Sequence, residues 1–289
     1  MIDLVTKFSP LVDERFEVES KTSLVTNKDY DFIGTHSIKI YTVDTAPMND
    51  YGRNVAISND ESENHVMSRY GVIKDLDTHL QEVSMEKDRS FAFVVDKEDE
   101  DETLRALNAG SALARQLREV VIPEVDKYTY KKMADNAGHT EYDVTITSNN
   151  AYTSLTDATE YMDEKKVPVD GRVAVVTPKF YKFLKQDKNA VLETEIGENM
   201  RIKGVIANMD GITIQKVVSS LLPEGLNFMV AHKIATTQAI KLAEYKLHTD
   251  TVLASGTIVT GRIYYTAFVR NNKKDAIYVN TAEEEPASL

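Results

Sequence analysis

Residues 102–136 read ETLRALNAGSALARQLREVVIPEVDKYTYKKMADN, and this stretch decides the fold. Apolar residues recur in it at steps of three and four, which predicts one face of an amphipathic helix. The face comprises Leu104, Leu107, Ser111 (a small residue in place of an apolar one), Ala114, Leu117, Val121, Val125 and Tyr128. A helix of this length extends roughly 50 Å at about 1.5 Å per residue, whereas a small domain spans roughly 30 Å. The sequence therefore predicts a long spine helix that a small domain cannot bury along its whole length.

The two ends of the predicted helix carry charges that suit a helix dipole. An acidic run from Asp96 to Glu102 precedes the helix, and Lys131 and Lys132 lie in its last turns. We expect Gly138 to end the helix in the left-handed conformation. Pro123 interrupts the pattern, because a proline in a helix removes a hydrogen bond and bends the axis. We expect one kinked helix here rather than two separate ones.

The composition limits the class of protein. The chain has 289 residues, of which 42% are apolar, enough for two domains with cores or for one elaborate domain. It has no cysteine, which excludes disulfides and thiolate metal sites and fits a reducing compartment. Residues 1–16 lack a secretory pattern and no apolar run is long enough to span a membrane, so we expect a soluble intracellular chain. The formal net charge of −12 disfavours tight binding of nucleic acid.

The rest of the chain mixes strand and helix patterns, which predicts an α+β fold. Asn149 and Asn150 are expected to cap one helix, and Thr177 with Pro178 to begin another. Asp210-Gly211 predicts a tight hairpin. The expected strands are 35–43, 82–87, 91–95, 172–176, 202–206, 212–217, 228–231, 240–247, 257–269 and 276–279. Residues 1–28 show no sustained period and are expected to form an arm or a frayed terminus.

Residues 44–79 contain too few apolar side chains to build a core. Seven acids, two arginines and one lysine lie among scattered apolar residues and turn formers. Insertions of this length are uncommon in compact domains unless they are functional or disordered. Two interpretations stay open: a disordered insertion, or a long hairpin that another molecule orders.

Several short strings, in this order, resemble the major capsid proteins of tailed bacteriophages, which have the Hong Kong 97-like fold. The strings are TAPMNDY at 45–51, KDRSFAFVVD at 87–96, REVVIPEVDKY at 118–128, GRIYYTAFV at 261–269 and NKKDAIYV at 272–279. They look like those of phages of Gram-positive bacteria in particular, and the resemblance extends from about Asn27 to Val279. It also implies a family in which the spine helix tolerates a proline such as Pro123.

The resemblance implies a map of the chain. It places an N-terminal arm at 1–29 and an extended loop, the E-loop, at 30–85. It assigns 86–148 with about 245–268 to a peripheral domain that holds the spine helix. It assigns 149–244 with about 269–280 to a mixed α/β axial domain, and leaves an acidic tail at 281–289.

The resemblance also implies a structural role. Copies would self-assemble into hexamers and pentamers and form an icosahedral or prolate head that encloses double-stranded DNA without reading its sequence. A portal, decoration proteins and a separate scaffolding protein are the expected partners, the last because only a short stretch precedes the loop. Assembly through a procapsid in the host cytoplasm and a final location in the virion follow from the same resemblance.

A set of loop and spine residues is expected to make the contacts between subunits. It comprises Asp50, Tyr51, Arg53, Arg69, Tyr70, Lys74, Glu98, Glu102 and Arg105. Arg53 and Arg69 are expected to pair with acids of a neighbour. Some members of the family link this loop to a neighbour by a lysine–asparagine isopeptide bond. Residues 47–73 contain no lysine, so we expect no covalent mesh.

The sequence offers no catalytic, cofactor or metal site. The usual nucleotide, hydrolase and metalloprotease motifs are missing, and the six histidines lack ligand spacing. His65 and His79 could meet across subunits as a pH sensor. Two alternatives to a phage shell remain: an encapsulin-type compartment with the same fold, and a small-molecule binding protein or enzyme with a long insertion. Particle size would separate a shell from the last of these.

Overall fold

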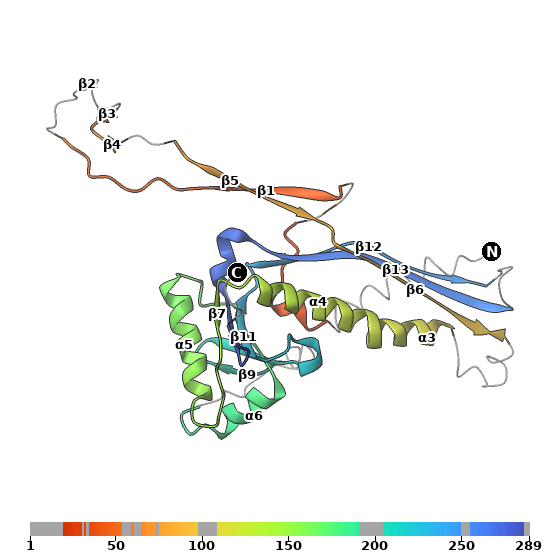
Figure 1. The fold of residues 1–289 in the computed structure, drawn as a ribbon. Coiled ribbons are helices and arrows are strands. Elements are labelled where there is room, and N and C mark those ends of the chain that lie inside the picture. Colours follow the sequence, from red (N-terminus) through yellow and green to blue (C-terminus); the bar gives the residue numbers. More distant parts are fainter. Residues whose placement is uncertain are drawn as a thin grey trace. The chain divides into compact units, whose positions relative to one another are not determined.

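The computed structural model describes residues 20–30, 32, 35–53, 59–60, 65–72, 75–97, 109–190, 205–249 and 255–285. These residues form two units (Figure 1). Unit 1 consists of Met1–His36 and Ser84–Leu289, and unit 2 of Ser37–Val83. Helices and strands occur together in the chain, so the predicted α+β class is confirmed.

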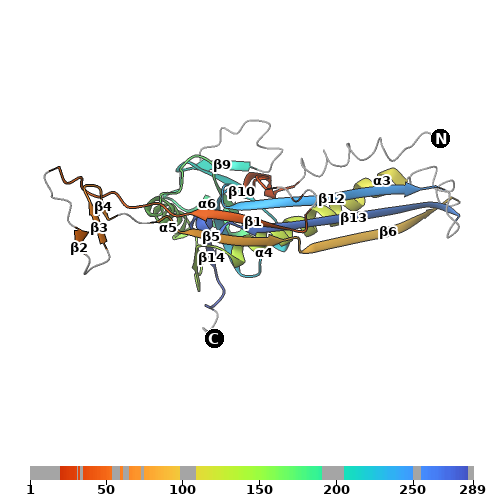
Figure 2. The ribbon, with the colours of Figure 1, turned by 90° about the horizontal axis from the view of Figure 1, so that it is seen from above.

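Unit 1 contains a long three-stranded antiparallel sheet. Its strands are β6 (Lys87–Asp96), β12 (Thr236–His248) and β13 (Gly256–Val269), with β13 in the middle (Figure 2). Gly261 of β13 pairs with Phe91 of β6 and with Tyr245 of β12. A Cβ atom at Gly261 would lie 2.3 Å from the Phe91 ring, so glycine lets the aromatic side chains of both neighbours cover the middle strand.

The spine helix is continuous over the part of it that the structure describes. It consists of α3 (Ala109–Gln116), the π-helical turn η2 (Leu117–Val121) and α4 (Ile122–Asp135). The prediction of one helix rather than two is confirmed for 109–135, whereas its expected beginning at 102–108 lies outside the described residues. Pro123 lies in the first turn of α4, directly after η2. The backbone N–H of Ile122 donates to the carbonyl of Leu117, five residues earlier, so a wider turn accommodates the proline.

The buried face of the spine differs from the predicted one in its first half. Ser111 is exposed and Ala114 is half-buried. One row of buried positions instead follows steps of four: Ala109, Leu113, Leu117, Val121, Val125, Thr129 and Met133. After the π-helical turn a second row lies beside it: Ile122, Asp126 and Tyr130. Steps of four drift by about 40° each on an ideal α-helix. The extra residue in the π-helical turn offsets part of this drift, which the prediction could not include.

The spine helix and the three-stranded sheet share one apolar core. Leu113, Leu117 and Val125 of the helix pack in one cluster with Val259 and Ile263 of β13. Each of these side chains is at most 4% exposed. Burying a leucine, valine or isoleucine contributes about 1.5–3 kcal/mol. This core therefore fixes the helix along the sheet, as Figure 2 shows.

A six-stranded mixed sheet forms the second part of unit 1. Its order is β7 (His139–Glu141), β14 (Ile277–Thr281), β11 (Leu226–His232), β8 (Arg172–Val176), β10 (Ile212–Lys216) and β9 (Val205–Met209). The pairs β7–β14 and β8–β10 are parallel and the others antiparallel. All five residues of β8 are buried, as its apolar run predicted. Asp210 and Gly211 have φ angles of 47° and 75°, which confirms the predicted hairpin between β9 and β10.

Helices α5 (Ala151–Glu164) and α6 (Pro178–Gln186) pack against this sheet. The predicted cap of α6 is confirmed, because the Thr177 hydroxyl accepts the N–H of Phe180 at 3.3 Å. Asn150 occupies the cap position of α5, but its side chain does not cap the helix. Its amide oxygen accepts the N–H of Thr147 at 2.7 Å, and Asp187 accepts the N–H of Tyr152 at 3.1 Å instead.

Gly138 corrects another prediction. It is not among the glycines with a positive φ, so it does not end the spine helix in a left-handed conformation. Asn136 follows the helix and its side chain donates to the carbonyl of Lys132 at 2.9 Å. A Cβ atom at Gly138 would lie 2.5 Å from the Cα of Asp275. Glycine is needed here for a close approach of two backbones.

Three short 3₁₀ helices complete unit 1: η1 (Thr22–Leu24), η3 (Ser219–Leu221) and η4 (Asn271–Ala276). The segment that holds η1 is packed, since Thr22 and Val25 are both fully buried. For residues 20–28 the interpretation as a frayed terminus is therefore wrong. Residues 1–19 of the expected arm lie outside the described part.

Unit 2 consists of two small sheets. Strands β1 (Ser37–Val43) and β5 (Thr78–Ser84) form one, and β2 (Asn59–Asp60), β3 (His65–Ser68) and β4 (Gly71–Val72) form the other. The expected strand at 82–87 is wrong, because β5 ends at Ser84 and β6 begins at Lys87. Between them Met85 donates its N–H to the carbonyl of His36 at 3.0 Å, outside both ladders.

Candidate assembly surface

Two segments of unit 2, the limbs at 49–53 and 69–70, meet at a pair of tyrosines. The rings of Tyr51 and Tyr70 lie 5.1 Å apart, edge to face. Gly52 donates its N–H to the carbonyl of Arg69 at 2.9 Å, and the Asn49 side chain donates to the carbonyl of Tyr70 at 3.2 Å. A turn at 69–70 separates β3 from β4, so these bonds fix the turn against the limb at 49–53.

Five of the nine predicted contact residues belong to this region. Asp50, Tyr51, Arg53, Arg69 and Tyr70 are all exposed, and the backbone bonds bring the two limbs that carry them together. The structure therefore presents two arginines and two aromatic rings in one small area. The other four predicted contact residues lie outside the described residues: Lys74, Glu98, Glu102 and Arg105.

Unit 2 exposes apolar side chains and has almost none buried. It holds seven of the eleven large exposed apolar residues of the described chain: Tyr41, Val43, Met48, Tyr51, Tyr70, Leu76 and Leu80. Met48 is 98% exposed. Only Ile40 and Val83 are buried among its described apolar residues, and neither belongs to a core cluster. Exposed apolar side chains gathered in one unit that lacks a core of its own are typical of a protein–protein interface.

Of the two histidines expected to meet across subunits, the structure describes the side chain of His79. The Nε2 atom of His79 lies 3.1 Å from a carboxylate oxygen of Asp44, an exposed contact inside the same unit. Asp44 also donates its backbone N–H to the carbonyl of Asp77 at 2.9 Å. The side chain of His65 lies outside the described residues, so the pH-sensor hypothesis stays untested.

A buried carboxylate on the spine helix holds the segment that carries η1. Asp126 is 1% exposed. One of its oxygens accepts the hydroxyls of Ser20 and Thr22 at 2.7 and 3.1 Å, and the other accepts the N–H of Lys21 at 2.9 Å. Burial raises the pKa of Asp126, although these three donors oppose the shift. Gln215 of β10 adds a bond from its side-chain amide to the carbonyl of Lys21 at 2.9 Å.

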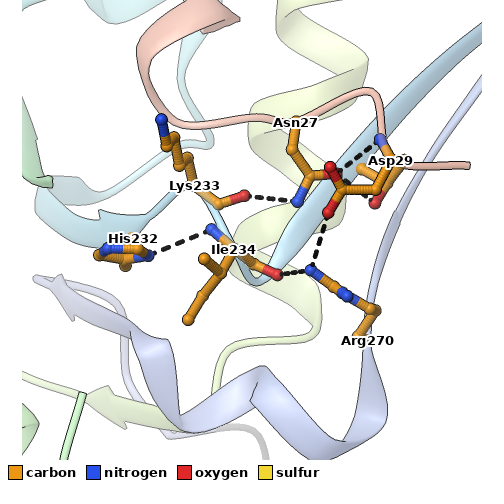
Figure 3. A network of polar contacts seen from close by, with 7 residues as sticks. Asn27, Asp29, His232, Lys233, Ile234 and Arg270 are labelled. Carbon is orange, nitrogen blue, oxygen red and sulfur yellow. Dashed lines mark hydrogen bonds and ion pairs between the residues drawn. The ribbon is translucent and has the colours of Figure 1, made fainter. Parts of the chain in front are cut away.

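A second group of contacts holds the same segment at the start of β12 (Figure 3). The Asn27 side chain donates to the carbonyl of Lys233 at 2.8 Å, and its amide oxygen accepts the hydroxyl of Thr237 at 2.6 Å. Arg270 lies beside it, 3.3 Å from the carboxylate of Asp29, and donates also to the carbonyl of Ile234. Residues 20–29 therefore connect the spine helix with both sheets of unit 1.

The roles of Asp126 and Asn27 were not predicted. One signal was available, because Asp126 lies among the apolar residues Ile122, Val125 and Met133 of the helix. A charged residue on a buried helix face requires partners. What the sequence could not reveal is that the partners lie more than a hundred residues earlier.

The exposed side of the spine helix carries ion pairs to β6 and its preceding turn. Arg89 lies 2.7 Å from Glu124, and Lys132 lies 2.8 Å from Glu86. Burial raises the pKa of Glu86, but hydrogen bonds from Lys132 and Tyr128 outweigh it, so that the pKa lies below its ordinary value. Exposed pairs of this kind contribute about 0–1 kcal/mol each. These ion pairs hold exposed side chains in place and contribute little to the stability of the fold.

The described residues show no site for a metal ion: no group of three or more histidine, aspartate or glutamate side chains is placed to hold one. Among the same residues, no helix is long and apolar enough to cross a membrane.

Comparison of folds relates the chain to capsids. A chain of Mycobacterium phage Che8 is similar, with a TM-score of 0.67, 16% identity and coverage of 91% of this chain and 90% of that one. The capsid of cyanophage P-SCSP1u gives a TM-score of 0.63 at 14% identity, covering 89% and 86%. A virus-like particle from Pyrococcus furiosus gives a TM-score of 0.54 at 10% identity, covering 94% and 99%. These likenesses show the fold, which is the Hong Kong 97-like one expected from the sequence.

Comparison of sequences identifies the family. No curated protein matches the chain. The model of the family described as phage capsid protein matches residues 82–280, from the end of β5 to the end of β14. Since this match covers well over half of the sequence, the chain belongs to the phage capsid protein family, and it is a tailed-phage major capsid protein whose copies assemble into the shell of the virion.

Proposed function

We propose that copies of this chain form hexamers and pentamers, which close together into an icosahedral or prolate head around double-stranded DNA. One observation carries the proposal. Unit 2 exposes seven large apolar side chains and has no core cluster of its own among its described residues. A surface of this kind is stable when other molecules cover it, and a symmetric shell supplies an identical neighbour at every position.

Unit 2 is the proposed extended loop, and its paired tyrosines are the proposed contact with a neighbour. Tyrosine and arginine are enriched in protein interfaces, where they combine apolar area with polar ends. Tyr51, Tyr70, Arg53 and Arg69 supply both kinds of residue in one area. The three-stranded sheet with the spine helix would form the peripheral domain, and the six-stranded sheet with α5 and α6 the axial domain.

The proposal includes partners and a place of assembly. A scaffolding protein would guide assembly in the host cytoplasm, a portal would occupy one vertex, and decoration proteins would bind the finished shell. DNA would be enclosed without base-specific contacts, because the net charge of −12 gives no general affinity for phosphates. The chain would carry out no catalysis.

The second candidate is a compartment that encloses an enzyme. Its support is the fold of the virus-like particle from Pyrococcus furiosus, which covers 94% of this chain. The content of the particle separates the two candidates. A phage head contains double-stranded DNA, and a compartment contains protein cargo and no genome.

The experiment is to express the full chain, alone and with the other head proteins of its phage, and to measure particle size by light scattering and negative-stain electron microscopy. The proposal expects hollow shells built from six-membered and five-membered rings. Discrete particles of a few subunits under both conditions would contradict it. Shells that fill with protein and never with DNA would favour the compartment.

A further inference from the structure

Helix α6 carries an exposed lysine face. Lys179, Lys182 and Lys185 recur every three residues on the side of the helix opposite Phe180 and Leu184, which are buried. Two further exposed lysines extend the face: Lys188, just beyond the helix, and Lys216, the last residue of β10. None of the five takes part in an ion pair in the part of the chain that the structure describes.

A buried tyrosine fixes two of these lysines in place. The ammonium groups of Lys185 and Lys216 lie 4.9 and 5.8 Å from the centre of the Tyr181 ring. A cation over a tyrosine ring is attracted by the negative face of the ring. The contact therefore joins α6 and β10 into one continuous positive surface, in a chain whose net charge is −12.

Helix α5 carries an exposed acidic face. Asp157, Glu160 and Glu164 recur at helical spacing and are exposed, and Glu141 of the edge strand β7 lies beside them. Partial burial raises the pKa of Asp157, and so do the like charges of Glu141 and Glu160. Among the described residues, Asp157, Glu160 and Glu164 form no ion pair. Glu141 accepts hydrogen bonds from the Tyr278 hydroxyl and the Asn280 amide, both at 2.7 Å, but has no cationic partner among them.

The strand residues of the two faces, Glu141 and Lys216, lie toward opposite edges of the six-stranded sheet. Glu141 belongs to β7, which forms one edge, and Lys216 belongs to β10, which is next to the other edge. Four strand spacings separate them, or roughly 19 Å at about 4.8 Å each. Glu141 and Lys216 are therefore too far apart to pair with each other within one chain. The two helices themselves are in contact, and the N–H of Tyr152 in α5 donates to Asp187, directly after α6, at 3.1 Å. Figure 1 shows the two helices, α5 and α6, on this part of unit 1.

We propose that the lysine face of α6 docks onto the acidic face of α5 in a second copy of the chain. The inference rests on the proposed function and specifies one interface of the ring. Two different complementary surfaces on one molecule make a head-to-tail contact, which closes into a ring when the rotation per subunit permits it. Complementary charge selects this register, since bringing like-charged faces together is unfavourable.

Charge reversal tests the two faces separately. The basic-face variant is Lys179→Glu/Lys182→Glu, and the acidic-face variant is Asp157→Lys/Glu160→Lys. Each places like charges opposite one another at the two reversed positions, and we expect at least a tenfold loss of rings and shells by sedimentation velocity and electron microscopy. All four positions are exposed, so circular dichroism and the thermal midpoint of the unassembled subunit should stay close to wild type.

Mixing the two variants is the decisive measurement. In an alternating ring the reversed positions of one variant face the reversed positions of the other and carry opposite charges again, so the mixture should form rings although neither variant does alone. A ring of six can alternate and a ring of five cannot, so the mixture should form six-membered rings without closed shells. The control is Lys127→Glu/Lys131→Glu, which reverses the same number of exposed charges on α4. It should not rescue the acidic-face variant.

The outcomes distinguish this inference from the proposed function. Variants that assemble like wild type, or a mixture that stays unassembled, overturn the inference and leave the shell intact. Shells of the basic-face variant that form normally but retain less DNA would show that the lysine face binds nucleic acid instead, which also overturns it. A wild-type chain that forms neither rings nor shells overturns both.

Discussion

Asp126 lies on the buried side of α4, and all of its partners come from the segment at 20–22. Asp126→Asn keeps the size of the side chain but replaces one acceptor oxygen by a donor. One of the three facing donors is then left without an acceptor, which costs about 1–3 kcal/mol. We expect the free energy of unfolding to fall by that amount, measured by denaturant titration of the unassembled subunit. An unchanged value would show that these bonds do not contribute to stability.

The same residue gives a pH dependence with a definite sign. Because burial raises the pKa of Asp126, the folded chain binds this proton more tightly than the unfolded chain does. The free energy of unfolding should therefore decrease as the pH rises from the ordinary aspartate range through the raised pKa. Unfolding titrations between about pH 4 and pH 7 should show this component in wild type and not in Asp126→Asn. Parallel pH profiles would contradict the assignment.

Arg53 tests the exposed end of unit 2 at the same scale. It is exposed beside the tyrosine pair, and we expect it to pair with an acid of a neighbouring copy. One exposed pair contributes about 0.2–1 kcal/mol, but the contact recurs in every subunit of a shell. Arg53→Glu should therefore lower the yield and thermal stability of shells, whereas Arg53→Lys should retain most of both. Equal shells from Arg53→Glu and wild type would contradict the pairing.

Helix α6 is the helix whose first residue and cap were predicted correctly from the sequence. Thr177 accepts the N–H of Phe180 and donates its hydroxyl to the carbonyl of Asn227 at 3.0 Å. Thr177→Ala removes both bonds and should lower the free energy of unfolding by about 1 kcal/mol, within the range of 0.5–2 for such caps. Thr177→Ser keeps the hydroxyl and should cost less than half as much. Similar losses for both variants would mean that the methyl group, rather than the cap, matters.

Helices, strands and turns that depend on residues close in the sequence could be predicted. Features that depend on a hydrogen-bond partner far away in the sequence could not. The spine helix, β8 and the Asp210-Gly211 hairpin follow from periodicity, burial and turn chemistry within a few residues. By contrast, α5 is capped by Asp187, which comes 35 residues after Tyr152. Between β5 and β6, the N–H of Met85 donates to the carbonyl of His36, which lies about fifty residues earlier in the sequence. Neither partner is visible in the local pattern.

The candidate site divides in the same way. Exposed arginines and tyrosines of unit 2 were predictable, because their stretch has too few apolar residues for a core. The two charged faces could not be predicted as binding surfaces, because a charge run on a helix usually means only a solvated surface. The separation of Glu141 from Lys216 across the sheet follows from the strand order β7-β14-β11-β8-β10-β9, which no local pattern encodes.

At the scale of the whole molecule, the last prediction concerns how copies are held together in the shell. Residues 47–73 contain no lysine, and the exposed basic side chains at the tyrosine pair are the arginines at 53 and 69. A guanidinium does not form an isopeptide bond with asparagine, so the contacts of this region should be noncovalent. Purified shells boiled in detergent should run as a single band of monomer on a denaturing gel.

A noncovalent shell also obeys mass action, which gives a second and independent measurement. Association stabilises the assembled subunit by an amount that depends on its concentration. The midpoint of shell dissociation in denaturant should therefore rise with total protein, whereas the midpoint of the unassembled subunit should not. A ladder of covalent oligomers on the gel, together with a midpoint independent of concentration, would show that another nucleophile of the chain forms the link and that the loop closes the shell by chemistry instead of by packing.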